Sequence, residues 1–192
     1  MRCIVRQLIS VLLVLLFVSC ASAPEHLYTI ETAAALPPSK TANASVVVVG
    51  PVSLPEFLDR PQLVVRNDDY SLSVNEQERW AAPLKESLSR VLADELDKQQ
   101  ISTRFIAQVG VPVTSLKARL VIDIAHLDVS RKNGVTIVAH WAYRPTAADA
   151  KTIERTSTAH ADIKGSSYVA IAVGVHDVAT ALADRIGSEL PK

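Results

Sequence analysis

A long β-hairpin is predicted over residues 116–143, LKARLVIDIAHLDVSRKNGVTIVAHWAY, and the rest of the predicted fold is built around it. Apolar and polar residues alternate over 116–124, and a period of two is typical of a strand with one buried face. The alternation changes parity at Leu127, which predicts a β-bulge. Lys132-Asn133-Gly134 then predicts the turn, since Asn-Gly tolerates the positive φ of tight hairpins. Alternation resumes over 135–143, so we expect a second strand there.

A third strand and a helix are predicted after this hairpin. Polar residues alternate with Ile153, Ala159 and Ile163, so the three strands should form an antiparallel meander with one solvent-exposed face. The last segment instead repeats its apolar residues every three or four positions, which indicates an amphipathic helix. Its apolar stripe consists of Ile171, Val175, Val178, Leu182, Ile186 and Leu190. Gly174 within it costs up to ~1 kcal/mol and predicts a close contact.

A second amphipathic helix is predicted upstream, ending near Gln100. Its apolar stripe consists of Trp80, Leu84, Leu88, Val91, Leu92 and Leu96. Asn75 and Glu78 resemble a capping box. That start would place Pro83 inside the helix, where it costs ~3 kcal/mol. We therefore expect the helix to begin near Trp80 or Ala81, with Pro83 in the first turn and Trp80 in the core.

Four further strands complete the predicted fold. They are Val46–Val49, Gln62–Arg66, Tyr70–Val74 and Ile101–Val109, the first β-branched throughout as in a strand buried on both faces. Strands and helices in this order predict an α+β domain over residues 45–192. We expect a mostly antiparallel sheet with the two amphipathic helices packed on one face.

Composition excludes several classes of function. Lys+Arg and Asp+Glu are both 20, so no basic excess exists to bind nucleic acid. Both cysteines, Cys3 and Cys20, lie at the N-terminus, and HExxH, GxSxG and GxxxxGK[ST] motifs are absent. His126, His140 and His160 could cluster on one sheet face, although we favour polar residues on an exposed face. We expect no metal, no catalytic residue and no enzymatic activity.

The N-terminus predicts a lipoprotein signal. Arg2 and Arg6 precede 11 residues, 8–18, that are apolar apart from one serine, which is shorter than the ~20 residues of a transmembrane helix. The segment VSCAS, 18–22, resembles a bacterial lipobox, and the alternative is an ordinary secretory signal. Residues 1–19 would be the signal peptide, and 20–44 a lipidated tether in which Leu27–Ile30 could form a short pairing strand.

Similarity to bacterial lipoproteins implies a diacylglyceryl thioether and an amide-linked acyl chain on Cys20. About two chains suffice for stable anchoring. No Asp follows Cys20, which points to the outer membrane, with the domain facing the periplasm.

The loop 54–61, LPEFLDRP, has two interpretations. Its apolar residues could tuck under the sheet, with an Asp59–Arg60 ion pair or an ion pair between loop and helix. Alternatively it is a docking surface, because a loop stiffened by prolines loses less entropy on binding. The residues that would contact a partner are Leu54, Phe57, Leu58, Asp59 and Arg60.

Three segments resemble the PqiC family, also called ABC-type transport auxiliary lipoproteins: LPEFLDRPQLVVR (54–66), ERWAAPL (78–84) and SRVL (89–92). Tyr28-Thr29-Ile30 is similar to an early segment of that family. The resemblance implies an outer-membrane lipoprotein that is the accessory docking subunit of an MCE-type intermembrane lipid transport system and supports envelope integrity. Its implied partner is an MCE-domain protein anchored in the inner membrane, and a homo-oligomeric ring would suit a tubular partner.

Two other functions remain open at this point. One is a periplasmic lipid-binding carrier with an apolar cavity between the helices and the sheet. The other is a lipid-anchored hydrolase whose Ser and His are distant in sequence. The docking subunit is the hypothesis we prefer, with the covalent lipid on Cys20 as its only non-protein group.

Overall fold

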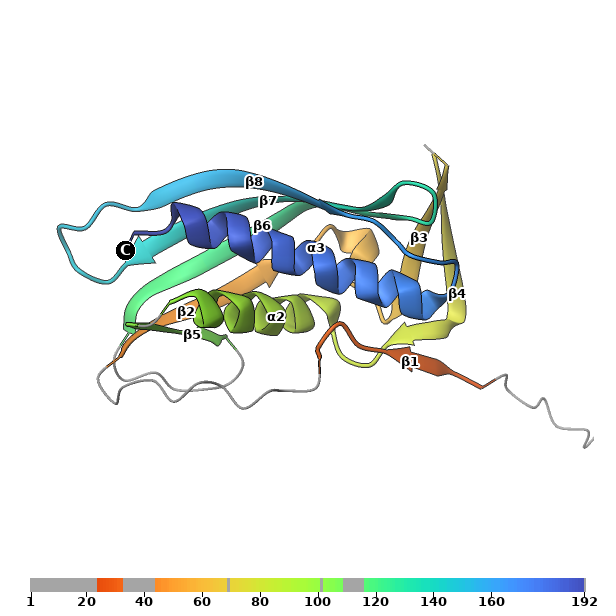
Figure 1. Ribbon diagram of the computed structural model, residues 1–192, viewed down its shortest axis with the longest axis horizontal. Coiled ribbons are helices and arrows are strands. Elements are labelled where there is room, and N and C mark those ends of the chain that lie inside the picture. Colours follow the sequence, from red (N-terminus) through yellow and green to blue (C-terminus); the bar gives the residue numbers. More distant parts are fainter. Residues whose placement is uncertain (1–23, 33–43, 69, 101, 109–115, 192) are drawn as a thin grey trace, which may run out of the picture.

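The computed structural model describes residues 24–32, 44–68, 70–100, 102–108 and 116–191, in which two helices cover one face of an eight-stranded sheet (Figure 1). The strands are β1 (His26–Tyr28), β2 (Ser45–Ser53), β3 (Gln62–Asp68), β4 (Ser71–Trp80), β5 (Thr103–Ala107), β6 (Leu116–Ser130), β7 (Gly134–Pro145) and β8 (Ile153–Ala161). The helices are α2 (Leu84–Gln99), α3 (Tyr168–Glu189) and a 3₁₀ turn, η1 (Glu56–Leu58). The α+β class with two packed helices is confirmed. The predicted signal peptide, Cys20 and residues 33–43 of the tether lie outside the described residues.

The long strand β6 lies at the centre of the sheet. One edge pairs antiparallel with β7, which pairs antiparallel with β8, so the predicted meander is confirmed. The other edge pairs in parallel with β2 over the first half of β6, and then with β3 at Ser130. The sheet is therefore mixed: β5 and β2 are parallel neighbours, whereas the longest ladders belong to the meander.

The β6–β7 hairpin has the irregularities that its sequence predicts. The register shifts between Ile124 and His126, so Leu127 and Val129 return to the buried face. Gly134 closes the turn with φ +74°, a left-handed conformation that glycine adopts without strain. A Cβ at Gly134 would lie 2.4 Å from the Ala161 carbonyl oxygen, so the neighbouring strand also requires glycine there.

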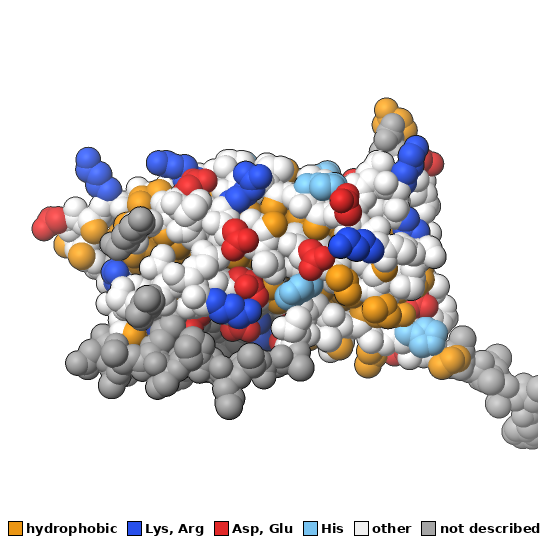
Figure 2. Space-filling model, in the orientation of Figure 1, with side chains coloured by type: hydrophobic (Ala, Val, Ile, Leu, Met, Phe, Trp, Pro, Cys, Tyr) orange, Lys and Arg blue, Asp and Glu red, His pale blue; other side chains and the backbone are white. Residues whose placement is uncertain are grey.

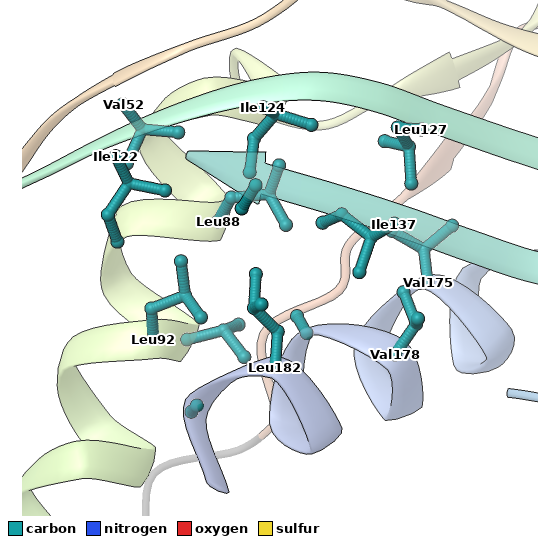
Figure 3. Close-up of a cluster of buried hydrophobic side chains, with 14 of the residues drawn as sticks. Val52, Leu88, Leu92, Ile122, Ile124, Leu127, Ile137, Val175, Val178 and Leu182 are labelled. Atoms are coloured by element: carbon teal, nitrogen blue, oxygen red, sulfur yellow. The ribbon is translucent and has the colours of Figure 1, made fainter. Parts of the chain in front are cut away.

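The core lies between the sheet and the two helices. Leu88 and Leu92 of α2 meet Val175, Val178 and Leu182 of α3 beneath the sheet (Figure 3). The sheet contributes Val52, Ile122, Ile124, Leu127 and Ile137 to this cluster. All six residues of the stripe predicted for α3 are buried. A Cβ at Gly174 would lie 2.9 Å from Ile163 Cγ1, which confirms the expected close contact.

The predicted start of the first helix is wrong. Trp80 ends β4, and α2 begins four residues later at Leu84, with Pro83 as its N-cap residue. Asn75 and Glu78 lie within β4 and form no capping box. Trp80 fits the helical spacing because it lies about one helical turn before Leu84. Its main chain is nevertheless extended, because it pairs with Tyr28 of β1. The ring is buried, as expected for a core residue.

Three other boundaries differ from expectation. β2 continues through Gly50-Pro51 to Ser53, because Val52 and Ser53 still pair with β6. β5 is shorter than the predicted strand, whose ends at 101 and 109 lie outside the described residues. Of the segment Leu27–Ile30, suggested as a short pairing strand within the tether, Leu27 and Tyr28 pair with β4. Ile30 is buried, and its carbonyl oxygen lies 2.8 Å from His176 Nδ1 of α3. The folded domain thus includes β1 and Ile30.

Replacing Gly134 by alanine tests the geometry of the hairpin. We expect Gly134→Ala to destabilise the domain by ~2 kcal/mol or more, because the left-handed backbone and the Ala161 carbonyl both oppose a Cβ. Urea denaturation measures the loss. Lys132→Ala in the same exposed turn is the control and should change stability by less than ~0.5 kcal/mol. Equal effects of the two substitutions would contradict this reading.

Candidate functional site

The loop 54–61 is an ordered turn between β2 and β3. The 3₁₀ turn η1 is closed by main-chain hydrogen bonds from Leu58 N to Pro55 O (2.9 Å) and from Asp59 N to Glu56 O (3.1 Å). These bonds direct Leu58 into the core, while Phe57 is 43% exposed. Leu54 is half-buried and packs against the core. The loop therefore tucks in part of its apolar surface and presents the rest.

A groove of about 530 Å³ runs between this loop and the start of α2. The Trp80 N–H donates to the Pro61 carbonyl over 2.7 Å, so the end of the loop and the end of β4 are held together. Pro61, Trp80, Ala81, Ala82 and Pro83 give the groove apolar walls. Its polar lining consists of Asp59, Arg60, Lys85 and Glu86. We call this surface the loop groove.

One ion pair crosses the mouth of the loop groove. Lys85 Nζ of α2 donates to Asp59 Oδ2 over 2.9 Å. The structure thus selects the ion pair between loop and helix over the Asp59–Arg60 pair. Both side chains are 43% exposed, so the pair contributes less than ~1 kcal/mol to stability, and its larger effect is on the shape and charge of the rim.

Side chains of β1 and β4 form a hydrogen-bonded cluster around the Glu78 carboxylate, next to the loop groove. The Tyr28 hydroxyl donates to Glu78 Oε2 over 2.5 Å, and His26 Nδ1 lies 3.1 Å from Glu78 Oε1. The Tyr28 hydrogen bond lowers the pKa of Glu78 below its ordinary value and, in return, raises the pKa of Tyr28 to about 12. The Ala81 N–H donates to the Tyr28 carbonyl, so this cluster positions the chain at the groove wall.

The segment after β1 is tied to both helices. Glu31 accepts hydrogen bonds from Ser87 Oγ (2.8 Å) and Arg90 Nε (2.9 Å) on α2. His176 on α3 bonds the carbonyl of Ile30, as described above. These contacts fix β1, and through it the wall of the loop groove, relative to the helix layer.

The three histidines considered for a cluster lie on the face of the sheet that the helices do not cover. His140 Nδ1 lies 2.8 Å from Thr156 Oγ1, and His160 Nδ1 lies 3.0 Å from Thr136 Oγ1, each across a β7–β8 pair. His126 is exposed on β6. Among the described residues, no group of three or more His, Cys, Asp or Glu side chains is arranged to hold a metal ion. A second hollow of about 550 Å³ lies on this face, lined by Asp123, His140, Arg144 and Glu154 among others.

Sequence reasoning found the loop but missed the rest of the groove. Leu54, Phe57, Asp59 and Arg60 are at the surface, wholly or in part, whereas Leu58 is buried. The walls at 80–83, the Lys85 partner of Asp59 and the Tyr28–Glu78 cluster come from other elements. Glu78 and Trp80 are two residues apart, the spacing of neighbours on one face of a strand, which could have indicated the cluster. Assigning Glu78 to a capping box instead favoured a helix.

These features define a compact α+β domain with a rigid surface groove. The family model described as "ABC-type transport auxiliary lipoprotein component" matches residues 28–187. The chain therefore belongs to the family of ABC-type transport auxiliary lipoproteins, which makes it an accessory lipoprotein of an ABC-type transport system. Within the described residues, neither helix is long and apolar enough to cross a bilayer.

Two solved structures have a similar fold. A crystal structure of an uncharacterized protein has a TM-score of 0.69 and 16% identity, over 88% of this chain and 100% of that one. The crystal structure of protein XCC0632 from Xanthomonas campestris has a TM-score of 0.63 and 16% identity, over 86% and 93% of the two chains. At this identity they support the fold alone. A search of curated protein sequences finds no match.

The Tyr28–Glu78 cluster predicts a specific pH dependence of stability. Because the pKa of Glu78 is lowered in the folded state, its stabilising contribution is present above the ordinary pKa of 4.5 and is lost as the pH falls through the lowered value. Glu78→Gln should therefore be less stable than wild type at neutral pH, and the difference should shrink in acid. Urea denaturation across this pH range measures it. The control is Glu76→Gln, at an exposed position on the same strand, whose stability should depend on pH as in wild type. A wild-type pH dependence for Glu78→Gln as well would contradict a stabilising role of the cluster.

Proposed function

We propose that this chain is a PqiC-like outer-membrane lipoprotein that serves as the docking subunit of an MCE-type lipid transport system. One observation carries the proposal: the segments that resemble the PqiC family, 54–66 and 78–84, are the two walls of the loop groove. Residues 67–77 separate these segments in sequence, yet both segments line one surface. Membership in the family of ABC-type transport auxiliary lipoproteins supports a role as an accessory subunit of a transport system.

The partner in this proposal is an MCE-domain protein anchored in the inner membrane that reaches across the periplasm. The loop groove would receive an apolar segment against Trp80 and Pro83, with Arg60 and Lys85 at its rim. Hydrogen bonds within η1 hold the loop in place before binding, so little conformational entropy is lost when the partner docks. Acyl chains on Cys20 would hold the domain on the periplasmic face of the outer membrane. A homo-oligomeric ring would match a tubular partner and place several grooves around it.

In this role the protein performs no catalysis, and any energy for transport comes from another subunit. The system would move lipids between the two membranes and thereby support envelope integrity. The carrier hypothesis needs an apolar cavity between helices and sheet. Buried side chains of α2, α3 and the sheet point into that space (Figure 3), which favours the docking subunit over the carrier. No arrangement among the described residues favours the hydrolase hypothesis over the docking subunit.

Removing the lipidation site tests the anchor. We expect Cys20→Ala protein to leave the membrane fraction and to appear as folded protein in the periplasm, because the acyl chains on Cys20 are the anchor in this proposal. Cell fractionation followed by thermal melting of the released protein measures both properties. A folded Cys20→Ala protein that stays with the outer membrane as completely as wild type would contradict lipid anchoring.

Substitutions at the loop groove test docking separately from folding. We expect Phe57→Ala and Arg60→Ala to weaken capture of the MCE-domain protein about tenfold, equivalent to ~1.4 kcal/mol, because both side chains are exposed beside the groove. Their melting temperatures should stay close to wild type. Leu58→Ala in the same loop is the matched comparison and should cost ~2–4 kcal/mol of stability, since Leu58 is buried. Undiminished capture by both exposed variants would refute the groove as the docking site.

A further inference from the structure

Exposed apolar side chains gather at one end of the molecule. Seven large apolar residues are exposed among the described residues, and six of them lie on β1, the β3–β4 hairpin and the start of α3. The six are Leu27, Tyr70, Leu72, Val74, Val169 and Val173. Phe57, beside the loop groove, is the seventh. Figure 2 shows hydrophobic side chains at the hairpin tip and again over the start of α3, on either side of charged residues.

Contacts between elements place these residues at the same end. The Tyr28 and Tyr168 rings lie 6.1 Å apart and join β1 to the first turn of α3. The Arg131 guanidinium lies 4.7 Å from the centre of the Tyr168 ring and brings in the β6–β7 turn. Arg66 pairs with Ser130 beside that turn and is four residues from Tyr70, so the tip of the β3–β4 hairpin lies at the same end. Figure 1 shows the hairpin projecting there, beyond the body of the sheet.

Five of the six apolar residues form two stripes, and the sixth, Leu27, lies on β1. Tyr70 is 98% exposed at the hairpin tip, and Leu72 and Val74 follow at every second position of β4, which places them on one face. Val169 and Val173 are four residues apart on α3, which places them on one face of its first turns. Side chains of this kind are common singly on protein surfaces, but a cluster at one end indicates a contact surface.

The N-terminal chain leaves from this same end. Pro24, the first described residue, lies just before β1, and Cys20 precedes it by four residues. Four residues of extended chain span at most about 14 Å. If Cys20 is acylated, the surface of the bilayer is therefore within that distance of Pro24. A bilayer this close to Pro24 faces the end of the molecule that carries the apolar residues.

We propose that this end is a membrane-contact surface, in which the tip of the β3–β4 hairpin and the first turns of α3 enter the interfacial region of a phospholipid bilayer. The orientation rests on the proposed anchoring at Cys20, whereas the contact itself is a property of the six apolar residues. Asp68 lies beside the tip and Lys132 in the adjacent turn, so the charges at this end are mixed. The contact is accordingly apolar and does not require anionic lipid. A second contact would hold the domain in one orientation, which acyl chains on a single residue cannot do alone.

Fluorescence quenching tests this contact without relying on acylation in the cell. Cys20 is the single cysteine of the mature chain 20–192, because Cys3 lies in the signal peptide, so it can be coupled to a maleimide lipid in vesicles. Tyr70→Trp and Val169→Trp place an indole in each stripe. Ala148→Trp is the control, because it lies in the exposed β7–β8 connection at the opposite end of β7 from the β6–β7 turn. The native Trp80 and Trp141 are buried and contribute the same background to all three proteins.

With phosphatidylethanolamine and phosphatidylglycerol vesicles brominated in the acyl chains, we expect quenching of Tyr70→Trp and Val169→Trp to exceed that of Ala148→Trp at least twofold. Equal quenching of all three proteins would overturn the proposal. Self-association in the absence of lipid would also overturn the proposal, if the mass of the protein in solution rises with concentration and Tyr70→Ser and Val169→Ser abolish the rise. This end would then bind a second copy of the chain. Mass spectrometry of native Cys20 tests the anchor separately, so failure of the proposed function and failure of this contact have different signatures.

Discussion

The fold depends on the pairing of one long strand, β6, with both parts of the sheet. Its first half binds β2 and its end binds β3, while β7 covers the whole of its other edge. Its alternating residues Leu120, Ile122 and Ile124 face the two helices and are fully buried. Without this strand, the β3–β4 hairpin would lose its main-chain pairing with the rest of the sheet. The wall of the loop groove at Trp80 would be affected as a consequence, since Trp80 ends β4.

Local pattern was enough to predict the parts of the fold that are held by local contacts. The β6–β7 hairpin, its bulge near Leu127, the buried stripe of α3 and the close contact at Gly174 all follow from periodicity and turn chemistry. The start of α2 did not, because Trp80 fits a helical and a strand pattern equally well. Only pairing with Tyr28, distant in sequence, decides between them. The parallel pairing of β2 with β6 is likewise a long-range contact that no local signal contains.

The candidate site shows the same division. The loop 54–61 could be recognised from its prolines and apolar residues, but its opposite wall and the Lys85 partner of Asp59 come from a later part of the chain. Burial of Leu58 and exposure of Phe57 depend on the hydrogen bonds of η1, which composition does not indicate. The proposed docking surface and the proposed membrane contact use different residues, so substitutions can test the two surfaces separately.

Site-specific photocrosslinking in the intact envelope tests whether the loop groove contacts the MCE-domain protein. A photoreactive residue at position 60 lies at the rim of the loop groove, and one at position 148 lies at the exposed far connection. We predict that position 60 captures an MCE-domain protein of the inner membrane and that position 148 does not. Capture of that protein from neither position, in cells where the transport system is active, would contradict the assignment of this domain as its docking subunit.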